Sequence, residues 1–172
     1  MHTRLCQGRA IICDAKHFRF FVRIRVFMNI TSCHILLIED NVLDADLIKR
    51  ALQKVEAGIH LEIASDGEEA IEYLDKWEKG TPTPIVILLD LKLPKISGLD
   101  VLKQLKAHPK YKLLPVVVLT SSNEMLDIQQ AYDLGANSYI LKAIDYDQFS
   151  SAISLIHRYW CEIGRAACRE SG

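Results

Sequence analysis

The chain has 172 residues, of which 49% are hydrophobic and 25% are charged, with 21 Lys and Arg against 22 Asp and Glu. This composition is typical of a globular protein with room for one domain and some excess. The charge is uneven, because residues 1–29 hold six basic residues and one acidic residue, whereas residues 30–160 hold 13 basic and 19 acidic residues. An acidic domain argues against nucleic acid as the main ligand.

The N-terminal extension, residues 1–29, is basic. Its run "FRFFVRIRVFM" is interrupted by arginine every two to four residues, which excludes a signal-peptide core and a membrane span. Two interpretations stay open: an upstream in-frame translation ahead of Met28, which we prefer, or a basic arm that contacts anionic lipid. The tail, residues 161–172, resembles the translation of a sequencing-adaptor read-through. We assign no function to either end.

Five cysteines lie at positions 6, 13, 33, 161 and 168, and no two of them form a CxxC pair. An odd, unpaired set is typical of a reducing compartment. We therefore expect a cytoplasmic protein that has neither a metal framework nor a disulfide framework.

From residue 34 onward, short apolar runs alternate with segments of helical spacing. The runs predict strands, since they are rich in aliphatic and β-branched residues: "HILLIED" (34–40), "HLEIAS" (60–65), "IVILLD" (85–90), "PVVVLT" (115–120) and "NSYILK" (137–142). The first helical segment carries an apolar stripe from Leu43 to Val55, and the second opens with Asp66 and Glu69 in capping-box positions. Three more helical segments follow, around 101–105, 128–134 and 145–160.

Five strands that alternate with five helices predict an α/β fold. Each βα unit adds one strand to a doubly wound parallel sheet that helices cover on both faces. The predicted domain extends from about residue 30 to about residue 160, with no internal repeat and no low-complexity linker.

Chemically active side chains follow four of the five predicted strands. Glu39 and Asp40 end the first run, Asp90 the third, Thr120 the fourth and Lys142 the fifth. Because the carboxyl ends of parallel strands meet at one edge of a sheet, we expect these side chains to lie close together.

This combination of side chains favours phosphoryl chemistry. Three neighbouring carboxylates raise each other's pKa unless a cation lies among them. Oxygen ligands in an open site suit Mg²⁺, which usually also binds phosphate. Formation of an aspartyl phosphate needs a carboxylate nucleophile beside Mg²⁺. It also needs a hydroxyl donor, such as Thr120, and an ammonium group, such as Lys142.

Taken one at a time, these residues have ordinary interpretations. Glu39 and Asp40 suit the N-terminus of a helix, and Thr120 and Lys142 suit a protein surface. Tyr139 suits a strand aromatic that packs on the last helix. The functional interpretation therefore depends on all four strand-end positions occurring together and in order.

The motifs "LLIEDN", "ILLDLKLPKISG", "VVVLTSS" and "SYILK" resemble, in order and spacing, the receiver domains of two-component response regulators, and the resemblance covers roughly residues 35–160. The segments "LPKISGLDVLKQLKAHP" and "SSNEMLDIQQAYDLGANSYI" are most similar to stand-alone receivers that work with phytochrome-type sensor kinases. The resemblance implies a flavodoxin-like (βα)5 fold with strand order 2-1-3-4-5. It also implies a phosphorelay module that takes its phosphoryl group from a histidine kinase or a phosphotransfer protein.

The resemblance also implies a role for each site residue. Asp90 is the expected phosphoacceptor, and Thr120 and Lys142 are the expected phosphate-binding residues. Mg²⁺ is expected on the carboxylates of Glu39, Asp40 and Asp90 and on the backbone carbonyl of Lys92. Thr120 and Tyr139 are the expected switch residues, and the small Ser121 is expected to leave the phosphate reachable.

The chain departs from the receiver pattern at two positions. Ser97 stands before Gly98 where receivers usually have Asp, which is expected to change only a turn contact. Ala143 follows Lys142 where most receivers have Pro. We expect a trans Lys142–Ala143 peptide bond, because a cis bond before a residue other than proline costs about 2.5–4 kcal/mol.

Other functions fit the sequence less well. An aspartate-nucleophile phosphatase of the haloacid-dehalogenase type needs an Asp two residues after the nucleophile, where this chain has Lys92. A degenerate receiver that serves as a scaffold is disfavoured by the complete set of site residues, and no nucleotide-binding glycine motif is present. We expect a signalling phosphoacceptor without nucleic-acid or membrane partners, and not an enzyme that turns over a free substrate. The fourth helix, fifth strand and fifth helix are the expected face for a homodimer or partner.

Overall fold

The computed structural model describes residues 33–56, 58–142 and 145–163, and the statements below concern this part of the chain. Its five strands form one parallel sheet in the order β2-β1-β3-β4-β5, which confirms the predicted fold class and strand order. The strands are β1 (His34–Ile38), β2 (His60–Ala64), β3 (Val86–Leu89), β4 (Val116–Thr120) and β5 (Ser138–Leu141). The helices are α2 (Val42–Val55), α3 (Gly67–Glu78), α4 (Gly98–Ala107), α5 (Met125–Asp133) and α6 (Tyr146–His157), and α6 continues into a π-helical segment, η1 (Arg158–Ile163).

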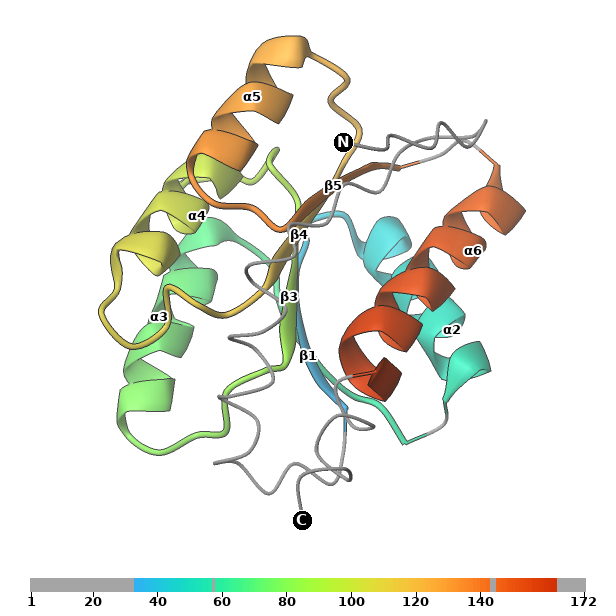
Figure 1. Ribbon diagram of the computed structural model, residues 1–172, viewed down its shortest axis with the longest axis horizontal. Helices are drawn as coiled ribbons and strands as arrows, with labels where there is room; N and C mark the ends of the chain where they lie inside the picture. Colours follow the sequence, from blue (N-terminus) through green and yellow to red (C-terminus); the bar gives the residue numbers. More distant parts are fainter. Residues whose placement is uncertain (1–32, 57, 143–144, 164–172) are drawn as a thin grey trace, which may run out of the picture.

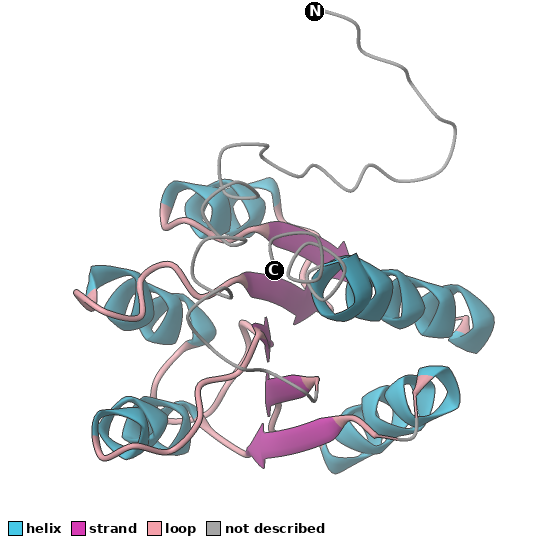
Figure 2. Ribbon diagram, turned by 60° about the horizontal axis from the view of Figure 1, so that its bottom comes forward, coloured by secondary structure: helices cyan, strands magenta, loops and turns pink. Residues whose placement is uncertain are grey.

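The sheet is the middle one of three layers. Helices α2 and α6 cover one face, and α3, α4 and α5 cover the other (Figures 1 and 2). Along β1, Ile35 and Leu37 pack toward α2 and α6, while Leu36 and Ile38 pack toward the opposite helices. This alternation follows from the two-residue period of a strand, and it explains why the central strands are apolar at nearly every position.

Polar side chains fix where four of the five described α-helices begin. Asn41, Asp66, Ser97 and Asp145 each accept a backbone N–H from the first turn of the following helix. Such caps contribute about 0.5–2 kcal/mol each. Helix α5 differs, because the side chain of Glu124 at its N-cap position makes no such hydrogen bond.

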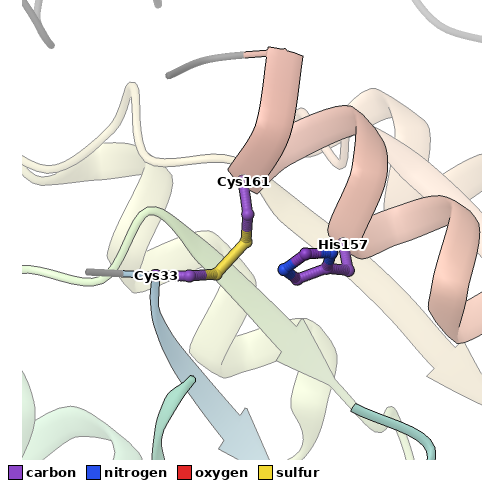
Figure 3. A group of neighbouring side chains, drawn as sticks. All are labelled: Cys33, His157 and Cys161. Carbon is purple, nitrogen blue, oxygen red and sulfur yellow. A yellow bond between two sulfur atoms is a disulfide. The ribbon is translucent and has the colours of Figure 1, made fainter. Parts of the chain in front are cut away.

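Cys33 and Cys161 are joined by a disulfide, with their Cα atoms 5.6 Å apart (Figure 3). The prediction that the cysteines supply no disulfide framework is therefore wrong for this pair. Helix α6 returns antiparallel to the strands, so the segment that follows it reaches the beginning of β1. The two cysteines are 128 residues apart in sequence, so no motif based on cysteine spacing could have predicted the disulfide. The other three cysteines lie outside the described residues.

The predicted domain boundaries are only partly covered by the structure. Residues 1–29 and most of the C-terminal tail lie outside the described residues. The last described element reaches Ile163, and Cys161, which we assigned to the tail, is fully buried.

Candidate functional site

The predicted site residues follow the strand ends at one edge of the sheet. Glu39 comes directly after β1, Asp90 after β3 and Lys142 after β5, while Thr120 is the last residue of β4. The parallel register aligns Ile38 with Leu89 in neighbouring strands, so the residues that follow them are brought together.

Lys142 lies at the centre of the site. Its Nζ atom is 2.6 Å from Oε2 of Glu39, 2.5 Å from Oδ2 of Asp90 and 2.8 Å from Oδ2 of Asp44. The three carboxylates raise the pKa of Lys142, although burial of the ammonium acts in the opposite direction and is the largest single effect. The ammonium group is therefore a fixed positive charge that joins the ends of β1, β3 and β5 to the first turn of α2.

Asp44 is a site residue that the sequence analysis missed. It lies in the first turn of α2, four residues after Asp40, and its side chain is partly exposed. Because Asp40 precedes the extended N-cap residue Asn41, helical spacing does not relate it to Asp44, and the sequence carried no signal that Asp44 belongs to the site.

Glu39, Asp40 and Asp90 form a group of carboxylates whose oxygen atoms lie within 4.8 Å of one another. Glu39 and Asp90 are buried, whereas Asp40 is exposed at the rim. Burial raises the pKa of Glu39 to about 7; the adjacent Lys142 ammonium lowers it, and the Asp90 carboxylate raises it. A cluster of hard oxygen donors that is open on one side fits a divalent cation such as Mg²⁺.

The two carboxylate oxygens of Asp90 have different partners. Oδ2 lies beside Lys142, while Oδ1 accepts a hydrogen bond of 3.0 Å from the backbone N–H of Lys92. The backbone of Asp90 packs closely against Gly98, since a Cβ atom on Gly98 would lie 2.1 Å from the Asp90 carbonyl oxygen. These contacts fix the orientation of the side chain.

Thr120 and Tyr139 are both linked to Ser122. The backbone N–H of Ser122 donates to Oγ1 of the fully buried Thr120 at 3.3 Å, and the Tyr139 hydroxyl donates to the Ser122 carbonyl at 2.9 Å. Burial, with a further contribution from the Asp127 charge, raises the pKa of Tyr139 to about 12. The ring packs with the core on the α3, α4 and α5 face, and not on the last helix as its ordinary interpretation suggested.

The two departures from the receiver pattern have different outcomes. Ser97 caps helix α4, where its Oγ atom accepts the N–H of Asp100 at 3.2 Å, so a turn contact is retained. Ser121 is exposed beside Thr120, which agrees with an open path to the site. The Lys142–Ala143 peptide bond lies outside the described residues, so its trans geometry stays a prediction.

The sheet is doubly wound and parallel, and a carboxylate cluster and a lysine lie at the carboxyl ends of its strands. This arrangement is that of a flavodoxin-like receiver domain. The chain's similarity to known proteins supports this class. A model of the response regulator receiver domain matches residues 35–154. FilR2 of Methanothrix harundinacea, a probable methanogenesis regulatory protein, is 39% identical over 127 residues, which are 73% of this chain and 82% of that protein.

Two further response regulators are also similar. Response regulator Rcp1 of Synechocystis is 35% identical over 130 residues, and its Mn²⁺-bound structure matches 75% of this chain and 94% of its own chain with a TM-score of 0.69. The phosphorylated cyanobacterial phytochrome response regulator RcpA is 37% identical and matches 76% of this chain and 94% of its own chain with a TM-score of 0.71.

The chain belongs to the response regulator receiver domain family. It is a phosphoacceptor module of two-component signalling, similar to stand-alone regulators, and this class replaces the phosphatase alternative. Receiver domains accept phosphate from histidine kinases or phosphotransfer proteins and bind Mg²⁺ or Mn²⁺ in their acidic pocket. In the described part of the chain, no helix is both long enough and apolar enough to cross a membrane.

Proposed function

We propose that Asp90 is the phosphoacceptor of this receiver. The observation that carries the proposal is the position of its Oδ2 atom, 2.5 Å from the Lys142 ammonium in a group that also contains Glu39 and Asp40. An Asp90 oxygen attacks the phosphorus atom of phosphohistidine, forming a phosphorus–oxygen bond as the bond to the imidazole nitrogen breaks. Lys142 neutralises charge on the phosphoryl group and the Thr120 hydroxyl donates to one of its oxygens.

Mg²⁺ is the proposed cofactor, held by the carboxylates of Glu39, Asp40 and Asp90 and by the carbonyl of Lys92. When bound, the ion neutralises negative charge on the carboxylates and on the incoming phosphoryl group. The similarity to a Mn²⁺-bound regulator supports a divalent cation at this position. The chain's own residues supply the rest: the backbone N–H of Lys92 holds Oδ1 of Asp90, and Glu39 and Asp90 are buried, so little water reaches their carboxylates.

The proposed location of this protein is the cytoplasm. The proposed partners are a sensor histidine kinase or a phosphotransfer protein, with no nucleic acid and no membrane surface. The chain assists only its own phosphorylation and dephosphorylation. Thr120 and Tyr139 are the proposed switch, because Ser122 links both of them to the loop that leads into α5. Movement of Thr120 toward a phosphoryl oxygen would therefore alter the contact that Tyr139 makes.

The test of the phosphoacceptor is intact-mass spectrometry after incubation with acetyl phosphate and Mg²⁺. We expect the wild-type chain to gain the mass of one phosphoryl group and Asp90→Asn to gain none, because an amide oxygen is a poor nucleophile. The matched control is Asp100→Asn, which removes an exposed carboxylate from the first turn of α4 and leaves the pocket intact. An adduct that persists in Asp90→Asn, or that forms equally well in EDTA, would contradict the proposal.

The proposed homodimer face comprises α5, β5 and α6. Its support is the exposure of Met125 and Leu126 in the first turn of α5, at 78% and 64%. The aromatic residues of α6 and η1 lie elsewhere: Tyr146 contacts Lys54 of α2, and Trp160 is buried in the core. We expect beryllofluoride, a phosphoryl mimic, to raise the sedimentation coefficient of the wild type and of Leu43→Asp, but not of Leu126→Asp. An unchanged coefficient of the wild type at all concentrations would exclude self-association.

The proposed domain comprises residues 30–160 together with the buried Cys161 at its C-terminal edge, and residues 1–29 and the rest of the tail are proposed to lie outside it. We expect a protein cut to residues 28–163 to unfold within a few degrees of the full chain, because all described strands and helices are retained. A protein cut to residues 28–160 lacks the buried side chain of Cys161 and its disulfide, so its unfolding temperature shows how much Cys161 contributes to stability. Thermal unfolding of the three proteins decides the boundaries, and a large loss in 28–163 would place the terminal residues within the domain.

A further inference from the structure

A second group of reactive side chains lies at the opposite end of the sheet from Asp90. Cys33 precedes β1, His157 ends α6, and Cys161 lies one turn further along in η1. All three are buried, with exposures of 1%, 1% and 0%. Figure 3 shows the disulfide between Cys33 and Cys161 with the imidazole ring of His157 directed toward it. The receiver chemistry at Asp90 uses none of these residues.

The donor set supplies three of the four ligands of a tetrahedral zinc site. One donor atom from each of Cys33, His157 and Cys161 lies within 4.8 Å of the other two. In tetrahedral zinc sites the Zn–S and Zn–N distances are about 2.3 and 2.0–2.1 Å, so neighbouring donor atoms lie roughly 3.5–3.8 Å apart. Once the disulfide is reduced, the two sulfur atoms have to move apart to this spacing, and the cluster then combines two soft thiolates with an imidazole.

The surroundings of His157 support the same function. Nε2 of His157 lies 2.8 Å from Oε2 of Glu56, which is the C-cap residue of α2. Glu56 therefore brings negative charge next to the cluster, which favours a bound cation.

We propose that Cys33, His157 and Cys161 bind Zn²⁺ when the two cysteines are reduced, which fastens the end of α6 to the start of β1. The disulfide is the oxidised form of the same pair and excludes the metal. Two thiols of a reductant convert the disulfide into two protein thiols and themselves become a disulfide. Each cysteine thiol then releases one proton as it binds Zn²⁺. Disulfides seldom persist in a reducing compartment, so the thiol form is the relevant one there.

The test measures zinc on the full chain in both oxidation states. The chain is reduced, loaded with Zn²⁺, desalted and examined by metal analysis. We expect one more zinc ion per reduced chain than per oxidised chain. Cys33→Ser and Cys161→Ser should lose this ion, whereas Cys13→Ser, a control outside the described residues, should keep it. Zinc loading should also raise the melting temperature of the reduced wild type but not that of Cys161→Ser.

His157→Gln separates a metal site from a simple disulfide, because this variant keeps both thiols. We expect it to form the disulfide on oxidation and to bind Zn²⁺ at least about tenfold more weakly than the wild type. Co²⁺ should give a thiolate-to-metal absorption band on reduced wild type, which provides a measurement that needs no variant. Equal zinc affinity in His157→Gln and wild type, or the absence of a cobalt band, would overturn the proposal. Phosphoryl uptake at Asp90 is measured separately, so failure of the zinc site leaves the receiver function untouched.

Discussion

Replacing Gly98 with alanine is expected to lower the free energy of unfolding by about 3 kcal/mol or more. A Cβ atom at this position would lie 2.1 Å from the Asp90 carbonyl oxygen and 2.6 Å from the Cα atom of Leu91. Both neighbours are backbone atoms, so neither can move aside as a flexible side chain would, and overpacking against a fixed neighbour is costly. Urea denaturation measures the change. Helix α4 would have to shift away from the β3 end, so phosphoryl uptake at Asp90 should fall as well.

Gly58→Ala is the matched control. No atom lies within 4 Å of a Cβ atom built at Gly58, and its backbone is outside the left-handed region. Because alanine restricts the unfolded chain more than glycine does, we expect no loss of stability and a gain of up to about 1 kcal/mol. Equal unfolding midpoints for Gly98→Ala and Gly58→Ala would show that α4 does not need its close approach to Asp90.

Replacing Lys142 with methionine is expected to cost about 3 kcal/mol of stability in the absence of divalent cations. The Nζ atom contacts three carboxylates, two of which belong to the buried residues Glu39 and Asp90. Removing one partner of a buried ion pair leaves the other charge uncompensated, which typically costs about 3–5 kcal/mol. Added Mg²⁺ should stabilise the variant more than the wild type, because the ammonium group no longer competes for the same oxygens.

Lys95→Met tests the same change at the surface. Lys95 also has two carboxylate partners, Asp66 and Glu68, but its side chain is 52% exposed. Solvent screens exposed ion pairs strongly, so we expect only a small loss of stability and no dependence on Mg²⁺. Denaturation with and without Mg²⁺ compares the two variants. A loss in Lys95→Met as large as that in Lys142→Met, or a Mg²⁺ effect that is the same in both, would contradict this account of the site.

The sequence contained enough information to predict the sheet and most of the site. The apolar runs marked the strands because a buried parallel sheet leaves little room for polar side chains, as the full burial of β1, β3 and β4 illustrates. The residues at the strand ends could also be predicted, because Glu39, Asp90 and Lys142 follow directly on the apolar runs. The parallel topology brings these three residues together.

Features that depend on tertiary structure were harder to predict. Asp44 looks like an ordinary first-turn acid, and only the direction of the Lys142 side chain brings it into the site. The contact between Cys33 and Cys161 depends on where η1 lies relative to the start of β1, because the two cysteines are 128 residues apart in sequence. The face on which Tyr139 packs depends on the register of β5 with β4, since a shift of one residue would turn the ring to the opposite face.

The missing side-chain cap on α5 has a consequence for how a signal would spread. Helix α4 is held at its start by the Ser97 cap and by the contact of Gly98 with Asp90, so displacing it would disrupt both. Helix α5 has no comparable anchor from Glu124, and its first turn exposes Met125 and Leu126 to water. The start of α5 is instead tied to the end of β4 through Ser122, whose hydroxyl donates to Asp127 in the first turn of α5. If Thr120 and Ser122 move when Asp90 is phosphorylated, we expect the first turn of α5 to move with them while α4 stays in place.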